Sequence, residues 1–283
     1  MKKSFFLAAL TALFSVGTSA AVADPDAFVS ASVGNMSVEF GQSDERNEHL
    51  SLRGRVTGAY NFTPALGAQG DLLLRMDSHE GAAFAFDFSA IDGALHLFYR
   101  EPENFLLGGI VQLGNSKSLI DGDELWSLNR SYVGAEAQAF FDQITLYGQL
   151  GFETLSPDYD ALWDADGWFI TGEVRHFLTP DFKLEAHAGL SELDLNVDDN
   201  AIALTTRNIG VGAEYKFENL PISMFGSYDY GQTSIDGDVA FDSHRVMAGL
   251  KLNLGEDSLQ DRDRTGASLK PVDFNSLDRI TLF

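Results

Sequence analysis

The chain is dominated by segments in which apolar and polar residues alternate with a period of two. Across residues 50–62, one register carries Leu50, Leu52, Val56, Tyr60 and Phe62, and the other carries serine, arginine, threonine and asparagine. Alternation of this kind predicts β-strands with one apolar and one polar face. In a soluble sandwich the apolar face packs against a second sheet, whereas in a transmembrane barrel it meets lipid and the polar face lines the lumen.

The N-terminal sequence distinguishes these two settings. Lys2 and Lys3 precede an apolar run over residues 5–16, and residues 21–23 have the small-residue pattern of a cleavage site for export. The apolar run is shorter than the ~20 residues that a membrane helix needs, although a buried N-terminal helix is an alternative. We therefore expect residues 1–23 to be a signal peptide, Asp24 to begin the mature protein, and residence in a membrane to depend on strands.

The connections between the alternating segments are short and long in turn. The short ones lie at residues 63–65, 101–104, 142, 179–181 and 218–221, and the longer polar ones lie near residues 41–48, 77–81, 115–129, 155–166, 194–202 and 232–242. Proline, which ends strands, occurs in four of the five short ones. If residues 82–100 form one strand with a bulge at residues 90–93, the pattern predicts an all-β fold: a transmembrane antiparallel up-and-down β-barrel of about 12 strands over residues 24–254. Splitting residues 82–100 gives thirteen strands, against the even number usual for bacterial barrels.

Aromatic residues gather at both ends of the predicted strands. Those beside the short connections are Tyr60, Phe62, Tyr99, Phe105, Phe141, Phe182 and Phe217, and those near the long connections are Phe40, Phe152, Trp168, Tyr228 and Tyr230. Aromatic rings favour the interface between hydrocarbon and headgroups, so we interpret the first set as an aromatic girdle. The core of a soluble sandwich would instead concentrate its aromatic residues in the middle of the strands.

Two short segments within this pattern add a family resemblance. Residues 97–103 (LFYREPE) and 260–264 (QDRDR) resemble segments of poorly characterised proteobacterial outer-membrane β-barrel proteins, and nearly the whole mature chain is similar to porin-like proteins. The resemblance implies a bacterial outer-membrane location, contact with lipid and lipopolysaccharide, and handling by the barrel assembly machinery. Residues 247–254 are similar to the closing strand that this machinery recognises, although here residues 255–283 follow it and Phe283 supplies a C-terminal aromatic.

The chain is strongly acidic, with 42 Asp and Glu against 19 Lys and Arg and a formal charge of -23. Removing the leader with Lys2 and Lys3 lowers this charge by two, to -25. Such a charge argues against a nucleic-acid partner. Many aspartates fall in the long polar connections, where we expect diffuse attraction of divalent cations but no metal site, because none has the spacing of a calcium-binding loop. Gly210 and Gly212 lack the third glycine of a dinucleotide-binding motif, so no cofactor is expected.

The polar register of the strands carries charges of both signs. These predicted lumen-lining residues are Arg53, Arg55, Asp71, Arg75, Asp87, Glu136, Glu153, Glu173, Arg175, Lys183, Glu185, His187, Glu214, Lys216, Asp229, Arg245 and Lys251. They can brace the wall as paired charges, bias the passage of ions, or do both. Because a twelve-stranded barrel permits only a narrow pore, we expect a porin-like channel for passive diffusion of small hydrophilic solutes or ions. A closed structural or adhesive barrel is the alternative.

A lipid-modifying outer-membrane enzyme is a third, less favoured possibility. His187 and Ser191 share a face of one strand but lie roughly 13 Å apart along it, too far for a hydrogen bond. His244 and Ser243 are adjacent and point to opposite faces. We therefore expect no catalytic site.

The last segment, residues 255–283, follows an even number of strands and is therefore expected to start in the periplasm. Its charges before Val272 predict a mobile periplasmic C-terminal tail. The apolar residues at its end allow it to dock against the barrel mouth or a partner, or in the lumen; they are Val272, Phe274, Leu277, Ile280, Leu282 and Phe283.

Overall fold

The chain folds into a closed antiparallel β-barrel, seen here in a computed structural model that describes residues 26–40, 46–80, 85–120, 123–158, 163–197, 200–255 and 257–274. The predicted signal peptide and the last nine residues lie outside this part of the chain. The strands are β1 (Asp26–Phe40), β2 (Arg46–Asn61), β3 (Leu66–Glu80), β4 (Ala85–Glu101), β5 (Phe105–Ile120), β6 (Asp123–Phe141), β7 (Ile144–Pro157), β8 (Trp163–Thr179), β9 (Phe182–Val197), β10 (Asn200–Lys216), β11 (Ile222–Ile235) and β12 (Asp238–Leu254).

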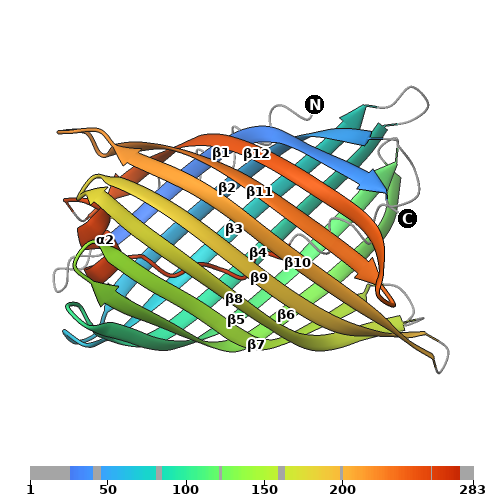
Figure 1. Cartoon of the computed structure of the whole chain (residues 1–283), viewed down its shortest axis with the longest axis horizontal. Coiled ribbons are helices and arrows are strands. Elements are labelled where there is room, and N and C mark those ends of the chain that lie inside the picture. The colour runs from blue at the N-terminus through green and yellow to red at the C-terminus, as the bar shows by residue number, and fades with distance from the viewer. Residues whose placement is uncertain are drawn as a thin grey trace.

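Each strand pairs with its neighbours in sequence, and β1 pairs with β12 from Ala27 opposite Leu254 to Phe40 opposite Phe241 (Figure 1). This last pairing closes the sheet and removes its edges. The predicted twelve-stranded barrel is therefore confirmed, as is the single strand at β4. The described residues also include one helix, α2 (Leu259–Thr265), and no helix among them is both long and apolar enough to cross a bilayer.

The two faces of the wall have the polarity of a membrane barrel rather than of a soluble sandwich. In β4, Leu95 and Leu97 are 53% and 57% exposed on the outer face, whereas His96 between them is fully buried on the inner face. The same arrangement, with apolar residues outside and polar residues inside, recurs around the barrel. Most large exposed side chains are aliphatic or aromatic, and many buried side chains are polar. An apolar exterior with a polar interior suits a wall that has lipid outside it.

The predicted bulge in β4 is wrong. The pairing of β3 with β4 runs without a shift from Leu66 opposite Tyr99 to Glu80 opposite Ala85. Phe88 is buried on the inner face, so the apparent change of apolar register reflects an inward-facing phenylalanine and no extra residue. Asp87, predicted to line the lumen, consequently lies on the outer face, where it accepts a hydrogen bond from Ser78 Oγ at 2.7 Å.

The long polar connections are also shorter than predicted, because strands occupy much of them. β5 continues to Ile120 and β6 begins at Asp123, so residues 115–129 lie almost entirely in strands. At this end the outer faces are polar as well; Asp166 and Asp194, for example, are exposed and face each other across β8 and β9. Where strands continue past the apolar band of the wall, both of their faces are polar, because the outer face meets water. The alternation of apolar and polar residues, by which a strand is recognised in sequence, is therefore lost there.

Candidate functional site

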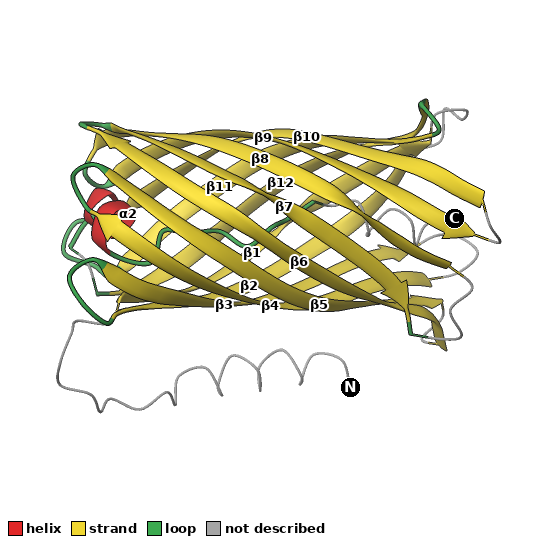
Figure 2. Cartoon of the chain, turned by 90° about the horizontal axis from the view of Figure 1, so that it is seen from below, coloured by secondary structure: helices red, strands yellow, loops and turns green. Residues whose placement is uncertain are grey.

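The chain turns back into the barrel after β12, at the end that carries the short connections. Gly255 makes this turn with a φ of 127°, a left-handed conformation that favours glycine, and a Cβ there would come within 2.6 Å of Asp26 Oδ1. Helix α2 follows, with Ser258 as its N-cap. In Figures 1 and 2 the helix lies at the mouth of the barrel and the chain continues extended inside the wall. We call residues 257–274 the luminal segment.

The helix is fastened to the first and last strands of the barrel. Arg262 Nε lies 3.2 Å from Asp26 Oδ2 on β1, and the same guanidinium donates to the side chain of Asn253 on β12. Asp26 Oδ2 also accepts from the backbone N–H of Ala267 at 2.6 Å. One arginine of the luminal segment therefore bridges the two strands whose pairing closes the barrel.

Beyond the helix, glutamine side chains of the wall bind the backbone of the luminal segment. Gln69 accepts from Leu269 N at 3.0 Å and donates to Leu269 O at 2.8 Å. Gln112 makes the same reciprocal pair with Val272, at 2.8 and 3.0 Å. Gln149 donates to Lys270 O at 2.8 Å. These primary amides occupy the positions that a neighbouring strand would fill, so the extended backbone is satisfied without joining the sheet.

Opposite charges add to this attachment. Lys270 Nζ lies 2.7 Å from Glu173 and 3.1 Å from Glu185, whereas Asp273 lies 2.8 Å from Arg53 and 3.2 Å from Arg75. In the helix, Asp263 pairs with Arg175 and accepts from Thr145 Oγ1. Together with Arg262, these residues place four charges of the luminal segment against wall residues of the opposite sign.

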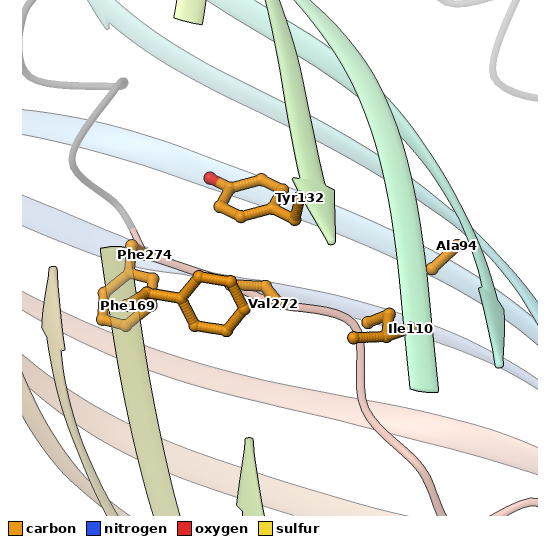
Figure 3. Packing of buried hydrophobic residues seen from close by; sticks show 6 residues of the cluster. All are labelled: Ala94, Ile110, Tyr132, Phe169, Val272 and Phe274. Atoms are coloured by element: carbon orange, nitrogen blue, oxygen red, sulfur yellow. The ribbon is translucent and has the colours of Figure 1, made fainter. Parts of the chain in front are cut away.

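Apolar contacts complete the packing of the segment. Val272 and Phe274 belong to a buried cluster with Ala94, Ile110, Tyr132 and Phe169, drawn in Figure 3. The rings of Phe274 and Phe169 lie 6.0 Å apart in an edge-on arrangement. Leu269 packs in a second cluster with Phe98, Leu106, Phe140 and Tyr147. Of the two predictions for the tail, mobility is therefore wrong for residues 257–274, whereas docking in the lumen describes them, because these apolar and hydrogen-bonding contacts hold them inside the barrel.

The structure places all of the predicted lumen charges except Asp87 on the inner face. Arg55 pairs with Asp71 at 2.7 Å, Lys251 with Glu214 at 2.7 Å, and Lys183 with both Glu185 and Glu214. The other positions are similar: Glu153 accepts from Tyr132 and Ser191, Glu136 contacts His96 and Tyr147, and Lys216 lies at the mouth near Asp181. Paired charges of both signs therefore brace the wall, and the luminal segment joins their network.

The predicted aromatic girdle lies on the outside of the barrel beside the short connections. Tyr60, Phe62, Tyr99 and Phe141 are more than 40% exposed, and Phe105, Phe182 and Phe217 are partly covered by aromatic neighbours. Tyr215, which the sequence pattern did not single out, links Phe182 and Phe217 through ring contacts of 6.2 and 5.4 Å. At the opposite end, Phe152 and Trp168 are exposed and face each other across β7 and β8.

The histidine and serine pairs considered for catalysis are separated. His187 pairs with Asp229 at 3.0 Å, whereas Ser191 donates to Glu153 at 2.9 Å. His244 lies on the outer face beside Tyr228, and Ser243 is buried on the inner face. At the rim, the exposed Asp158 accepts from Ser127 and Asn129, and these hydrogen bonds hold the pKa of its carboxyl below the ordinary value. The described residues contain no cluster that could hold a metal ion.

The luminal segment leaves open space along one side of the barrel. The glutamines that bind its backbone lie on β3, β5 and β7, whereas two cavities of about 240 and 260 Å³ are lined mainly by residues of β1, β2 and β8–β12. Both cavities are lined by Arg53, Glu185, Lys270 and Asp273, so they adjoin each other. A third cavity, of about 50 Å³, shares Lys183 and Lys251 with its neighbour and reaches Arg262 of α2. The space thus carries charged side chains of both signs and is smallest beside the helix.

A closed twelve-stranded wall with an apolar exterior, aromatic girdles and a charged interior defines an outer-membrane β-barrel. In agreement, the family model of the outer membrane protein beta-barrel domain matches residues 6–251, and the chain belongs to this family. The protein is therefore assigned to the bacterial outer membrane.

Solved structures of other outer-membrane barrels share this fold. An outer-membrane channel from Pseudomonas putida F1 is 15% identical with a TM-score of 0.58, and the match covers 84% of this chain and 98% of that one. The translocator domain of autotransporter NalP from Neisseria meningitidis is also 15% identical, with a TM-score of 0.53 and coverage of 89% and 94%. At these identities the similarity concerns the fold alone. No curated protein matches the chain by sequence.

Proposed function

We propose that this barrel is a narrow, porin-like channel for the passive diffusion of small hydrophilic solutes or ions. The observation that carries the proposal is the row of adjoining cavities with charged lining residues beside the luminal segment, which follows the wall from α2 to Thr171 and His187. The lining contains charges of both signs, which suits water and small polar solutes better than lipid chains. The luminal segment then sets the width of the conduit by filling the rest of the lumen.

The competing function is that of a closed structural or adhesive barrel. The narrow third cavity beside α2 favours it, because about 50 Å³ leaves room for little more than water. In both cases the outer surface contacts lipid and lipopolysaccharide, and the barrel assembly machinery recognises the end of the chain during insertion. The proposal includes no catalytic step, in keeping with the separation of His187 from Ser191.

Planar bilayer recording distinguishes the two functions. Purified protein whose migration on a gel changes after boiling, as expected for a folded barrel, is inserted into bilayers in potassium chloride. Discrete, long-lived conductance steps support the channel. Repeated insertions without steps, both for the whole chain and for a variant that ends at Gly255, would reject the channel in favour of a closed barrel.

A further inference from the structure

Arg245 on β12 is a buried guanidinium with little to bind. Its residue is 3% exposed, and its Nε has no hydrogen-bond partner among the described residues. One terminal nitrogen lies 3.7 Å from the sulfur of Met36, a weak acceptor. A buried cation is costly unless an anion is bonded to it directly, and this one lines the cavity of about 240 Å³. The arrangement points to an anionic ligand in that cavity.

Two further arginines already form a carboxylate-binding site at the same cavities. Arg53 on β2 binds one oxygen of Asp273 at 2.8 Å, and Arg75 on β3 binds the other at 3.2 Å. Guanidinium groups directed at both oxygens of a carboxylate are a strong and geometrically specific arrangement. Here the carboxylate is that of Asp273 in the luminal segment. The contacts that hold the segment at this point are non-covalent.

The neighbouring acidic side chains of the wall have other partners. Asp229 lies opposite Arg245 in the pairing of β11 with β12, yet its carboxylate is 3.0 Å from His187. Asp92 is shared by Arg75 and Arg130. Asp77 and Asp273 also lie within electrostatic reach of Arg245, but Asp77 accepts from Ser51, and Asp273 balances Arg53 and Arg75 from within the lumen. Arg245 shares these carboxylates with other partners, and this leaves its guanidinium able to attract an anion from solution.

We propose that this cavity binds small carboxylate solutes at Arg245, and that Asp273 is an internal competitor for the adjoining Arg53 and Arg75. The inference rests on the proposed channel function and names the class of solute that the conduit favours. A cavity of about 240 Å³ suits a short organic acid rather than a peptide or a lipid chain. Release of Asp273 would add two guanidinium groups to the site and strengthen binding.

Calorimetric titration of the detergent-solubilised full chain with succinate tests the proposal without requiring a current. Neutral succinamide, at the same ionic strength, is the control ligand. We expect weak succinate binding to the wild type and about tenfold tighter binding to Asp273→Asn, equivalent to ~1.4 kcal/mol. Asp263→Asn is the matched control variant, because it makes the same chemical change in the luminal segment, breaks an ion pair with the wall at Arg175, and lies outside the lining of the two larger cavities. Its succinate affinity should stay at the wild-type level.

Arg245→Gln and Arg245→Met, the latter a neutral chain of similar length, should each abolish the succinate signal in the Asp273→Asn background. Migration before and after boiling confirms that each variant is folded. Equal tightening by Asp273→Asn and Asp263→Asn would overturn the proposal, because it would indicate general loosening of the segment. Succinate binding that survives the loss of Arg245, or that succinamide matches, would also overturn it. Absence of conductance steps with succinate binding intact would reject the channel function and leave the binding site standing.

Discussion

Neutralising Asp273 should release the luminal segment measurably from the wall. Asp273 accepts charged hydrogen bonds from Arg53 and Arg75, and such bonds contribute about 1.5–3 kcal/mol each. The Asp273 side chain is 35% exposed, so solvent screens part of this attraction, and we take the combined loss in Asp273→Asn as about 2 kcal/mol. A change of this size multiplies the undocked population about 30-fold.

A single thiol can report this population, because the chain contains no cysteine. Ser268 is 8% exposed inside the lumen, and Ser268→Cys should react with a polar maleimide only while the segment is undocked. When redocking is faster than labelling, the labelling rate follows the undocked population. We expect Asp273→Asn to accelerate labelling by about 30-fold under these conditions.

The matched control is Asp257→Asn, the same chemical change at an exposed position of the same segment. Asp257 contributes its backbone oxygen, and not its carboxylate, to the contact with Lys216, so labelling should stay at the rate of the parent. Equal labelling rates in the two variants would refute the reasoning that the Asp273 ion pairs hold the segment in place.

Three further predictions concern the segment and the rim. Ending the chain at Gly255 should raise single-channel conductance in bilayers, because the filler of the lumen is gone; unchanged conductance would mean that the segment does not limit the conduit. Gly255→Ala should weaken docking by about 1–3 kcal/mol through backbone strain, seen as faster labelling at position 268. Magnesium ions should raise the thermal midpoint through the acidic rim, and sodium chloride should cancel this effect, since surface charges are screened within about 8 Å at physiological salt. A salt-insensitive effect would instead indicate a specific metal site.

The architecture was predictable because a membrane wall imposes one alternation on every strand. That logic gave twelve strands and the positions of the short connections, and all but one of the charges it assigned to the lumen lie on the inner face. It missed further buried inner charges, among them Asp77, Asp92, Arg100 and Arg130. It failed at Asp87, where an inward-facing Phe88 broke the assumption that apolar residues face lipid. It also misread the connection between β11 and β12, a two-residue Asp236-Gly237 turn with φ of 50° and 90°, although Asp-Gly is a strong hairpin signal.

The luminal segment was harder to predict because its binding groups resemble ordinary polar residues. Gln69, Gln112 and Gln149 carry no charge and sit in the polar register of their strands, where any hydrophilic residue would be acceptable. Their significance depends on contacts separated by more than 100 positions in the chain. Inward-facing glutamines on alternate strands are the sequence signal that could have indicated a strand-like ligand in the lumen.

Arg262, which contacts both β1 and β12, affects the lifetime of the closed barrel. Lateral opening of a β-barrel begins where the first and last strands meet, and here the ladder between β1 and β12 is reinforced by an arginine that holds Asp26 on one strand and Asn253 on the other. Separating β1 from β12 therefore requires breaking the Arg262 contacts in addition to the backbone hydrogen bonds between the two strands. The luminal segment thus stabilises the closed barrel, and the lifetime of the closed wall in the membrane depends on residues that are not part of the wall.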